Sequence, residues 1–189
     1  MKIVLATHNA HKVEELRKIL GPRLDGIELV GYDGPEPVED GETFEANALI
    51  KARAAYAHTG LAAIADDSGI SVDALGGAPG ILSARYAGTR DDGDNVRLLL
   101  ERMSGVDDRT AHFTCAAAYV DGETELVELG IWPGRVLDAT SGTHGFGYDP
   151  VFQPDGLPGS SAELTPDEKN AISHRAMAFA KLFDAIRAR

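Results

Sequence analysis

A short apolar run that ends in two acids, Ala63-Ile64-Ala65-Asp66-Asp67-Ser68-Gly69, limits the folds open to this chain more than any other stretch. Small and β-branched residues bounded by turn formers are typical of a strand that is covered on both faces. In open α/β sheets, ligands bind beyond the carboxyl ends of such strands. The stretch therefore predicts an α/β fold in which a strand stops at Asp66 and Asp67, beside a ligand.

The two neighbouring acids raise the question of a cation. Two carboxylates 4 Å apart repel each other by roughly 4 kcal/mol at an effective dielectric of about 20. Magnesium would relieve this repulsion, because it takes oxygen ligands from one or two carboxylates and shares the rest of its shell with water and substrate phosphates. The alternative is a solvated Asp-Asp turn that Ser68 and Gly69 close. The stretch alone leaves both interpretations open.

Length and composition predict one globular domain over residues 1–189, with two lobes. The formal charge of −12, from 18 basic and 30 acidic residues, argues against a protein that grips nucleic-acid backbones. A few lysines and a metal could still form a positive pocket for a small anion. The single cysteine, Cys115, rules out an internal disulfide and fits a reducing compartment. With no signal peptide or membrane span expected, we predict a cytoplasmic protein.

Hydrophobic periodicity predicts alternating strands and helices. Strands are expected at residues 3–6, 27–30, 109–120 and 123–131, and helices from Val13, over 43–59, over 91–103 and from Thr165 onward. Asp121-Gly122 predicts a hairpin turn, and Thr165-Pro166-Asp167-Glu168 is a capping box that begins the last helix. One face of that helix is expected to pack inward, with Ile172, Ala176, Phe179, Phe183 and Ile186.

Three further segments could hold an anionic or flat ligand. Residues 7–12, Thr-His-Asn-Ala-His-Lys, join a strand to a helix start, where backbone N–H groups attract phosphate, but they lack P-loop glycines and could equally cap a surface helix. Residues 31–41 are rich in glycine, proline and acids, which predicts a flap. Residues 142–152 carry glycines and three aromatics, which suit either stacking on a base or an aromatic core strand.

Six motifs occur in an order that resembles one family over essentially the whole chain. They are Thr7-His8-Asn9 with Lys12; Thr43-Phe44 with Asn47-Ala48 and Lys51-Ala52; Ala65 to Gly69; Leu75 to Gly80 with Ser83-Ala84-Arg85-Tyr86; Gly145 to Pro150; and Glu168 to Arg175. Each motif is modest alone, but six in register are specific. The chain is similar to the inosine/xanthosine triphosphate pyrophosphatases, which remove deaminated purine nucleotides.

The resemblance implies a two-lobed α/β fold with an elongated mixed sheet flanked by helices, a ligand cleft between the lobes, a homodimer and a requirement for Mg²⁺. It implies that Asp67 binds the metal and acts as general base, and that Asp66 supports it. Substrate contacts are implied for Thr7, His8, Asn9, Ala10, His11, Lys12, Lys51, Ser68, Phe146, Gly147, Tyr148, Asp149, Lys169, His174 and Arg175.

The sequence also departs from the family pattern. Val38 stands where many members carry a second acidic metal ligand. Its neighbour Glu39 is the candidate to replace that ligand. His8 and His11 replace small residues or lysine, and Ala46 replaces a frequent acid. The lost acid motivates a rival hypothesis, a catalytically silent nucleotide sensor. Maf-like pyrophosphatases are a further rival, but their arginine-rich N-terminal loop is missing between Thr7 and Lys12, and no sequence feature favours a scaffold protein.

Overall fold

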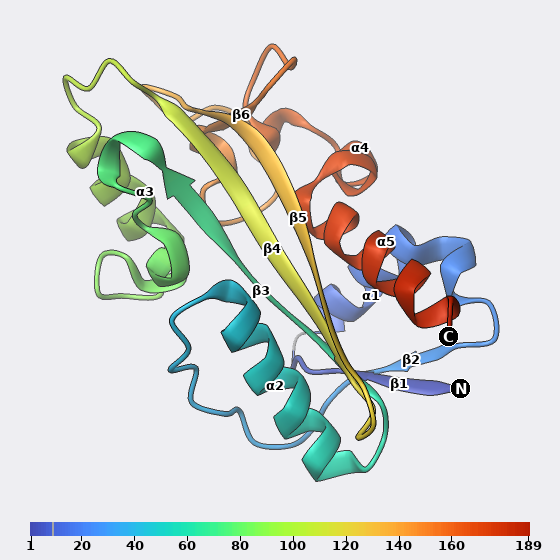
Figure 1. Cartoon of the computed structure of the whole chain (residues 1–189). Helices are drawn as coiled ribbons and strands as arrows, with labels where there is room; N and C mark the ends of the chain where they lie inside the picture. Colours follow the sequence, from blue (N-terminus) through green and yellow to red (C-terminus); the bar gives the residue numbers. More distant parts are fainter. Residues whose placement is uncertain (9) are drawn as a thin grey trace. The chain divides into compact units, whose positions relative to one another are not determined.

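The structure, a computed structural model, describes residues 1–8 and 10–189. Helices and strands alternate along most of the described chain (Figure 1). The strands are β1 (Lys2–Leu5), β2 (Glu28–Val30), β3 (Ala63–Val72), β4 (Thr110–Val120), β5 (Glu125–Val136) and β6 (Phe152–Pro154). The helices are α1 (Ala10–Leu20), α2 (Phe44–Thr59), α3 (Asp92–Arg102), α4 (Pro166–Ile172) and α5 (His174–Arg187). Within these residues, no helix combines the length and apolar content needed to cross a bilayer.

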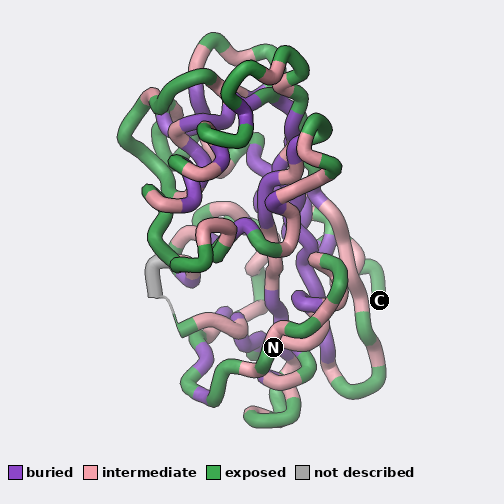
Figure 2. The backbone as a smooth tube through the Cα atoms, turned by 90° about the vertical axis from the view of Figure 1, so that its left-hand side faces the viewer, coloured by how far each residue is buried: buried purple, intermediate pink, exposed green. Residues whose placement is uncertain are grey.

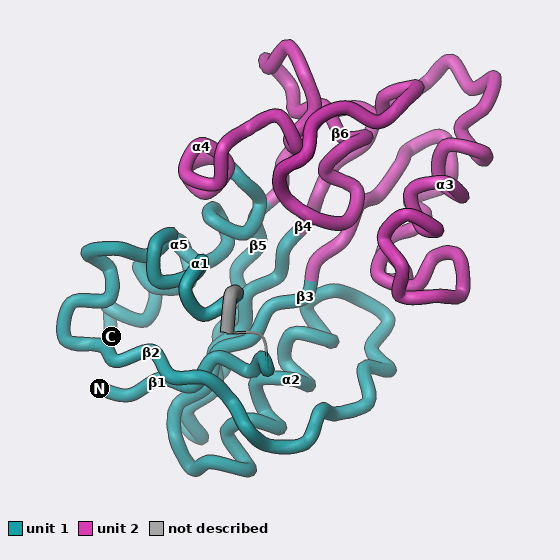
Figure 3. The backbone as a smooth tube through the Cα atoms, turned by 180° about the vertical axis from the view of Figure 1, so that it is seen from behind, with its two compact units in different colours: residues 1–67, 115–130, 173–189 teal, residues 68–114, 131–172 magenta. Residues whose placement is uncertain are grey.

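The described strands form one six-stranded sheet in the order β2-β1-β3-β4-β5-β6. Strand β1 pairs in parallel with β2 and β3, whereas β5 and β6 are antiparallel. This mixed α/β sheet with flanking helices confirms the expected fold class. Two compact units divide the chain, and β3, β4 and β5 each contribute residues to both (Figure 3). Unit 1 comprises residues 1–67, 115–130 and 173–189, and unit 2 comprises residues 68–114 and 131–172.

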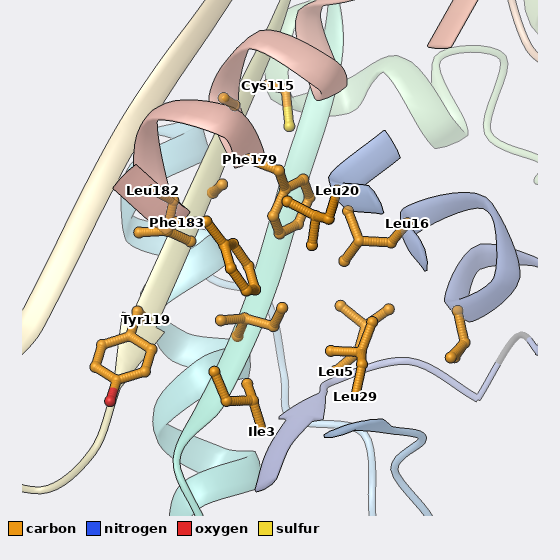
Figure 4. Packing of buried hydrophobic residues seen from close by; sticks show 14 residues of the cluster. Ile3, Leu5, Leu16, Leu20, Leu29, Cys115, Tyr119, Phe179, Leu182 and Phe183 are labelled. Atoms are coloured by element: carbon orange, nitrogen blue, oxygen red, sulfur yellow. The ribbon is translucent and has the colours of Figure 1, made fainter. Parts of the chain in front are cut away.

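In unit 1, both faces of the sheet are covered, and β4 shows this most clearly. Cys115, Ala117 and Tyr119 belong to a core cluster with side chains of α1 and α5 (Figure 4). The intervening Ala116 and Ala118 pack with the alanines of α2 instead. Because side chains alternate along a strand, β4 supports helices on both of its faces. The burial of Cys115 in this core was expected.

Unit 2 has its own apolar centre, in which three aromatic rings meet. The ring of Phe152 lies 4.5 Å from that of Phe113 and 5.6 Å from that of Trp132, measured between centroids. Helix α3 contributes Val96 and Leu99 to the buried residues. Across the chain the strands are mostly buried, whereas exposed residues concentrate in loops and on outer helix faces (Figure 2).

Side-chain caps fix the starts of α2, α3 and α4. Thr43 caps α2 through a bond from the amide of Ala46, and Gly60 ends that helix with a φ of 68°. Asp91 caps α3 in the same way. The capping box at the start of α4 is present, since Thr165 and Glu168 each bond the other's backbone amide.

Three expectations about element boundaries were wrong. Strand β5 runs to Val136 instead of ending at residue 131. Strand β3 does not stop at the acids but continues to Val72. Strand β1 pairs in parallel with β3 only as far as Ile64. It is therefore β1, and not β3, that ends before the acids. The last helix is broken at Ser173, whose hydroxyl caps a new helix by accepting a bond from Ala176. As a result Ile172 is 40% exposed rather than packed inward.

Gly130 is predicted to be essential for stability because α5 lies directly against β5 at this point. A Cβ atom there would lie 2.0 Å from the backbone oxygen of His174 and 2.7 Å from the nitrogen of Ala178. Overpacking of this kind typically costs about 1–3 kcal/mol. We therefore expect Gly130→Ala to lower the free energy of unfolding by at least that much in urea titrations.

Gly31→Ala is the matched control, because a Cβ at Gly31 meets nothing within 4 Å. It should change the free energy of unfolding by less than about 0.5 kcal/mol. Equal stability of the Gly130→Ala and Gly31→Ala variants would contradict the close packing of α5 on β5.

Candidate active site

The alternation of side chains along β3 sends its two acids to opposite faces of the sheet in unit 1. Ile64 belongs to the cluster that includes α1 and α5, and Ala65 belongs to the cluster that includes α2. With a period of two, Asp66 follows Ile64 and Asp67 follows Ala65. Each acid meets its own cation, Arg175 of α5 for Asp66 and Lys51 of α2 for Asp67. Cationic side chains of the protein therefore lie beside both carboxylates, and the binding of magnesium stays a prediction.

Asp66 is held in a buried ion pair. Oδ2 of Asp66 accepts bonds from Nε and Nη2 of Arg175, at 3.2 and 3.0 Å. Glu15 of α1 lies 3.6 Å from Nη1 of the same guanidinium. Burial opposes ionisation of Asp66, but the charges of Arg175, Lys12 and Lys51 outweigh it and hold the pKa of Asp66 well below its ordinary value. Asp66 thus stays ionised and anchors the first turn of α5 to β3.

Asp67 lies beside Lys51, a cation that it shares with a second acid, Glu39. Oδ1 of Asp67 lies 3.4 Å from Nζ of Lys51, and Oε2 of Glu39 lies 3.1 Å from the same nitrogen. Asn47, which is buried in α2, also donates to Asp67. Burial raises the pKa of Asp67, Lys51 lowers it and the charge of Glu39 raises it again, so that the net shift is upward. A carboxylate with a raised pKa is a better proton acceptor.

Lys51 is the positive centre of this cluster. Burial lowers the pKa of its ammonium, but Asp67, Asp66 and Glu39 together reverse the effect and leave the pKa raised. Its side chain is only 17% exposed, although a lysine in the middle of a helix is ordinarily solvated. The lysine therefore stays protonated and can serve as a fixed positive charge for phosphate.

The donor set around Asp67 fits magnesium. Two carboxylates, Asp67 and Glu39, converge on one ammonium nitrogen, and hard oxygen donors of this kind suit Mg²⁺, which uses one or two carboxylates and completes its shell with phosphate and water. Val38, at the expected position of the second acid, is 80% exposed. In the described chain, no group of three or more His, Cys, Asp or Glu side chains is arranged to hold a metal ion.

The segment between β1 and α1 is described only in part. Thr7 is half-buried. Lys12 lies on α1, close enough for its charge to lower the pKa of Asp66. His8 bonds the loop that follows β2. Asn9 and the side chains of Ala10 and His11 lie outside the described residues, so their roles stay predictions.

Unit 2 brings together the residues expected at the base. Asp149 is fully buried, and its carboxylate accepts bonds from the amide of Phe146 at 2.9 Å and from the hydroxyl of Ser161 at 2.8 Å, and also contacts Lys169. Nζ of Lys169 lies 4.8 Å from the centre of the Phe146 ring, which is 53% exposed. The geometry gives Asp149 a supporting role and leaves Phe146 with an accessible ring.

The backbone between these residues is also held. The amide of Gly147 donates to Asp92 of α3 at 2.8 Å, and the hydroxyl of Tyr148 donates to the carbonyl of Ser83 at 2.6 Å. Burial raises the pKa of Tyr148 above the ordinary tyrosine value, so this residue acts as a neutral anchor. Ser68 is half-buried in the same unit.

The expected group of Lys169, His174 and Arg175 is divided by the break at Ser173. Lys169 belongs to unit 2, whereas the buried His174 and Arg175 belong to unit 1. Arg175 contacts Asp66 and Glu15, so contact of His174 and Arg175 with a base stays a prediction.

Sequence reasoning missed several supporting residues, namely Glu15, Asn47, Asp92 and Ser161. Asn47 had a signal, since it lies one helical turn before Lys51 on α2. Asp92 is 55 positions from Gly147 in the sequence, and Ser161 is 12 positions from Asp149, so only the fold brings these partners together.

Comparisons with known proteins give one consistent result. Residues 3–185 match the model of the Ham1 family. A protein named dITP/XTP pyrophosphatase from Leifsonia xyli subsp. xyli is 57% identical over 193 aligned positions, which cover 100% of this chain and 96% of the relative. One of the same name from Streptomyces avermitilis is 49% identical, with 98% and 97% covered.

Two solved structures also resemble the chain closely. A Ham1 protein from Coxiella burnetii has a TM-score of 0.92 and 39% identity, with both chains fully covered. A nucleoside-triphosphatase / dITP/XTP pyrophosphatase from Mycobacterium abscessus has a TM-score of 0.80 and 47% identity, with 96% and 98% covered.

Asp66→Asn tests the buried ion pair. Removal of Asp66 takes away the closest counter-charge of the buried Arg175 guanidinium and leaves the more distant Glu15; breaking a buried pair typically costs about 3–5 kcal/mol. Because the pKa of Asp66 is lowered in the folded state, its contribution is complete above the ordinary Asp pKa of about 3.9 and declines as the pH falls below it. Urea titrations should show a constant deficit between pH 7 and pH 5, and a smaller one at pH 3.5.

Asp184→Asn provides the control, since it breaks a solvent-exposed pair with Arg23. Such pairs contribute about 0–1 kcal/mol. A deficit for Asp66→Asn no larger than that of Asp184→Asn would show that Arg175 does not depend on Asp66.

Proposed function

Because this chain belongs to the Ham1 family, we propose that it hydrolyses the deaminated purine nucleotides ITP, dITP and XTP to the monophosphate and pyrophosphate. Such an activity would cleanse the nucleotide pool and prevent misincorporation into DNA and RNA. The observation that carries the proposal is the cluster of Asp67, Glu39 and Lys51. It supplies a base, a pair of metal ligands and a phosphate-binding cation within one short range.

Asp67 is the proposed general base. It takes a proton from a water molecule, whose oxygen forms a bond to the α-phosphorus while the bond from that phosphorus to the bridging oxygen breaks. Pyrophosphate leaves with the electrons of that bond. The raised pKa of Asp67 favours the uptake of the proton. Lys51, Lys12 and Thr7, with the 8–11 segment, are assigned to the phosphates, whose charge they would neutralise.

Asp67 and Glu39 are the proposed magnesium ligands. When bound, the ion would supply charge neutralisation at the phosphates and orientation of the reacting groups. Glu39 takes the place that the exposed Val38 cannot fill. If Glu39 binds the metal, the observation that favoured a silent sensor no longer applies.

Unit 2 is assigned to the purine. The exposed ring of Phe146 can stack on a base, an interaction worth about 1–3 kcal/mol. Lys169 and the backbone of Gly147 and Tyr148 are assigned to the 6-oxo edge. Where a buried donor meets the 6-amino group of adenine it loses its acceptor, which costs about 1–3 kcal/mol per group.

We also assign the protein to the cytoplasm, as a homodimer. The buried thiol of Cys115, with no second cysteine in the sequence, supports a reducing compartment. The dimer is supported by the family resemblance, and a doubled mass in light scattering would be its signature.

A substrate panel tests the activity. Purified protein with Mg²⁺ is expected to release pyrophosphate from dITP and XTP with kcat/KM at least about 100-fold above that for ATP, since two lost acceptors multiply. dGTP, which also carries a 6-oxo group, is a useful intermediate case. Release from none of the four nucleotides would refute the activity, and tight nucleotide binding without release would favour the sensor.

Asp67→Asn tests the base. The amide cannot accept the proton, so dITP turnover should fall at least about 100-fold, within the range that general bases contribute. Circular dichroism and urea titration should show a folded protein, because Lys51, the partner of Asp67, keeps Glu39 as a counter-charge. Near-normal turnover would show that another group is the base.

A further inference from the structure

His8 connects the segment before α1 to the loop that carries Glu39. Its Nε2 lies 2.7 Å from the carbonyl oxygen of Gly34, and its Nδ1 lies 3.2 Å from Oε1 of Glu36. The imidazole also stacks on the ring of Tyr32, with centroids 5.5 Å apart and planes inclined by 13°. All of these residues belong to unit 1.

Both ring nitrogens of His8 face atoms that can only accept. A backbone carbonyl and a carboxylate have no proton to donate, so each bond requires an N–H on the imidazole. His8 therefore holds this loop at two points through one side chain.

The loop from Tyr32 to Gly41 is fixed at its other end by α2. The amide of Gly41 donates to the side chain of Asn47 at 2.8 Å. At its start, the hydroxyl of Tyr32 donates to the carbonyl of Pro35 at 2.9 Å, which folds the first residues onto the ring that His8 covers. Glu39 lies between the two attachments, five residues after Gly34, so both anchors restrict where its carboxylate can lie.

We propose that His8 is a positioning residue, which holds this loop so that the carboxylate of Glu39 stays beside Lys51 and Asp67. It acts on the affinity for the metal through Glu39 and not on the chemical step. The proposal rests on the proposed function only for the identity of the ion.

The test is a double-mutant cycle read by binding of Mn²⁺, followed by electron paramagnetic resonance on the full chain without nucleotide. His8→Ala should weaken Mn²⁺ binding about 10-fold, as supporting residues of metal sites do. His8→Gln keeps a donor for Gly34 and should recover part of the loss. In a Glu39→Gln background, His8→Ala should add less than about two-fold, because the two residues act in one path.

His58→Gln is the matched control. Its ring packs edge-on against the same Tyr32, at 5.6 Å between centroids, and lies beside Gly34, but within the described chain it forms no hydrogen bond with Gly34 or Glu36. It should leave Mn²⁺ affinity within about two-fold of wild type.

Three results would overturn the proposal: no Mn²⁺ binding by the wild type, equal binding by wild type and His8→Ala, or an equal loss with and without Glu39. An intact binding cycle in a protein that releases no pyrophosphate would instead refute the proposed function and leave the role of His8 standing.

Discussion

The two-residue period of β3 is the constraint on which the candidate site depends. Adjacent residues in a strand point to opposite faces, so neighbouring carboxylates that would repel each other in a turn are separated by the sheet itself. Asp66 meets a buried guanidinium and Asp67 meets a half-buried ammonium and a second carboxylate. One acid therefore stabilises the fold, and the other keeps a raised pKa and the capacity to react.

The small residues of β4 complete this arrangement. Cys115 and Ala117 face α1 and α5, while Ala116 and Ala118 face α2. Because these side chains are short, helices can pack closely on both faces, which brings Arg175 to one acid and Lys51 to the other. Gly130 extends the same principle to β5, where the backbone of α5 leaves no room for a side chain.

Features set by local chemistry were predictable from the sequence, and features set by distant partners were not. The caps at Thr43, Asp91 and Thr165 depend on bonds within three residues; the capping box at Thr165 and the helix starts at residues 43 and 91 were predicted. The length of β3 depends on β4 rather than on its own composition, so the acids falsely indicated its end. The break at Ser173 was hidden because the apolar spacing continues across it.

The candidate site divides in the same way. The acid pair drew attention to residues 66 and 67, and the family resemblance indicated Asp67 and Lys51. The pairing of Arg175 with Asp66 joins residues 109 positions apart, which no local pattern reveals. One further consequence concerns insertions and deletions. A single residue gained or lost before Asp66 would turn each acid toward the other's helix and reverse the apolar faces of the strand. The chain should therefore tolerate changes of length in its loops, but not at any position between Ala63 and Asp67.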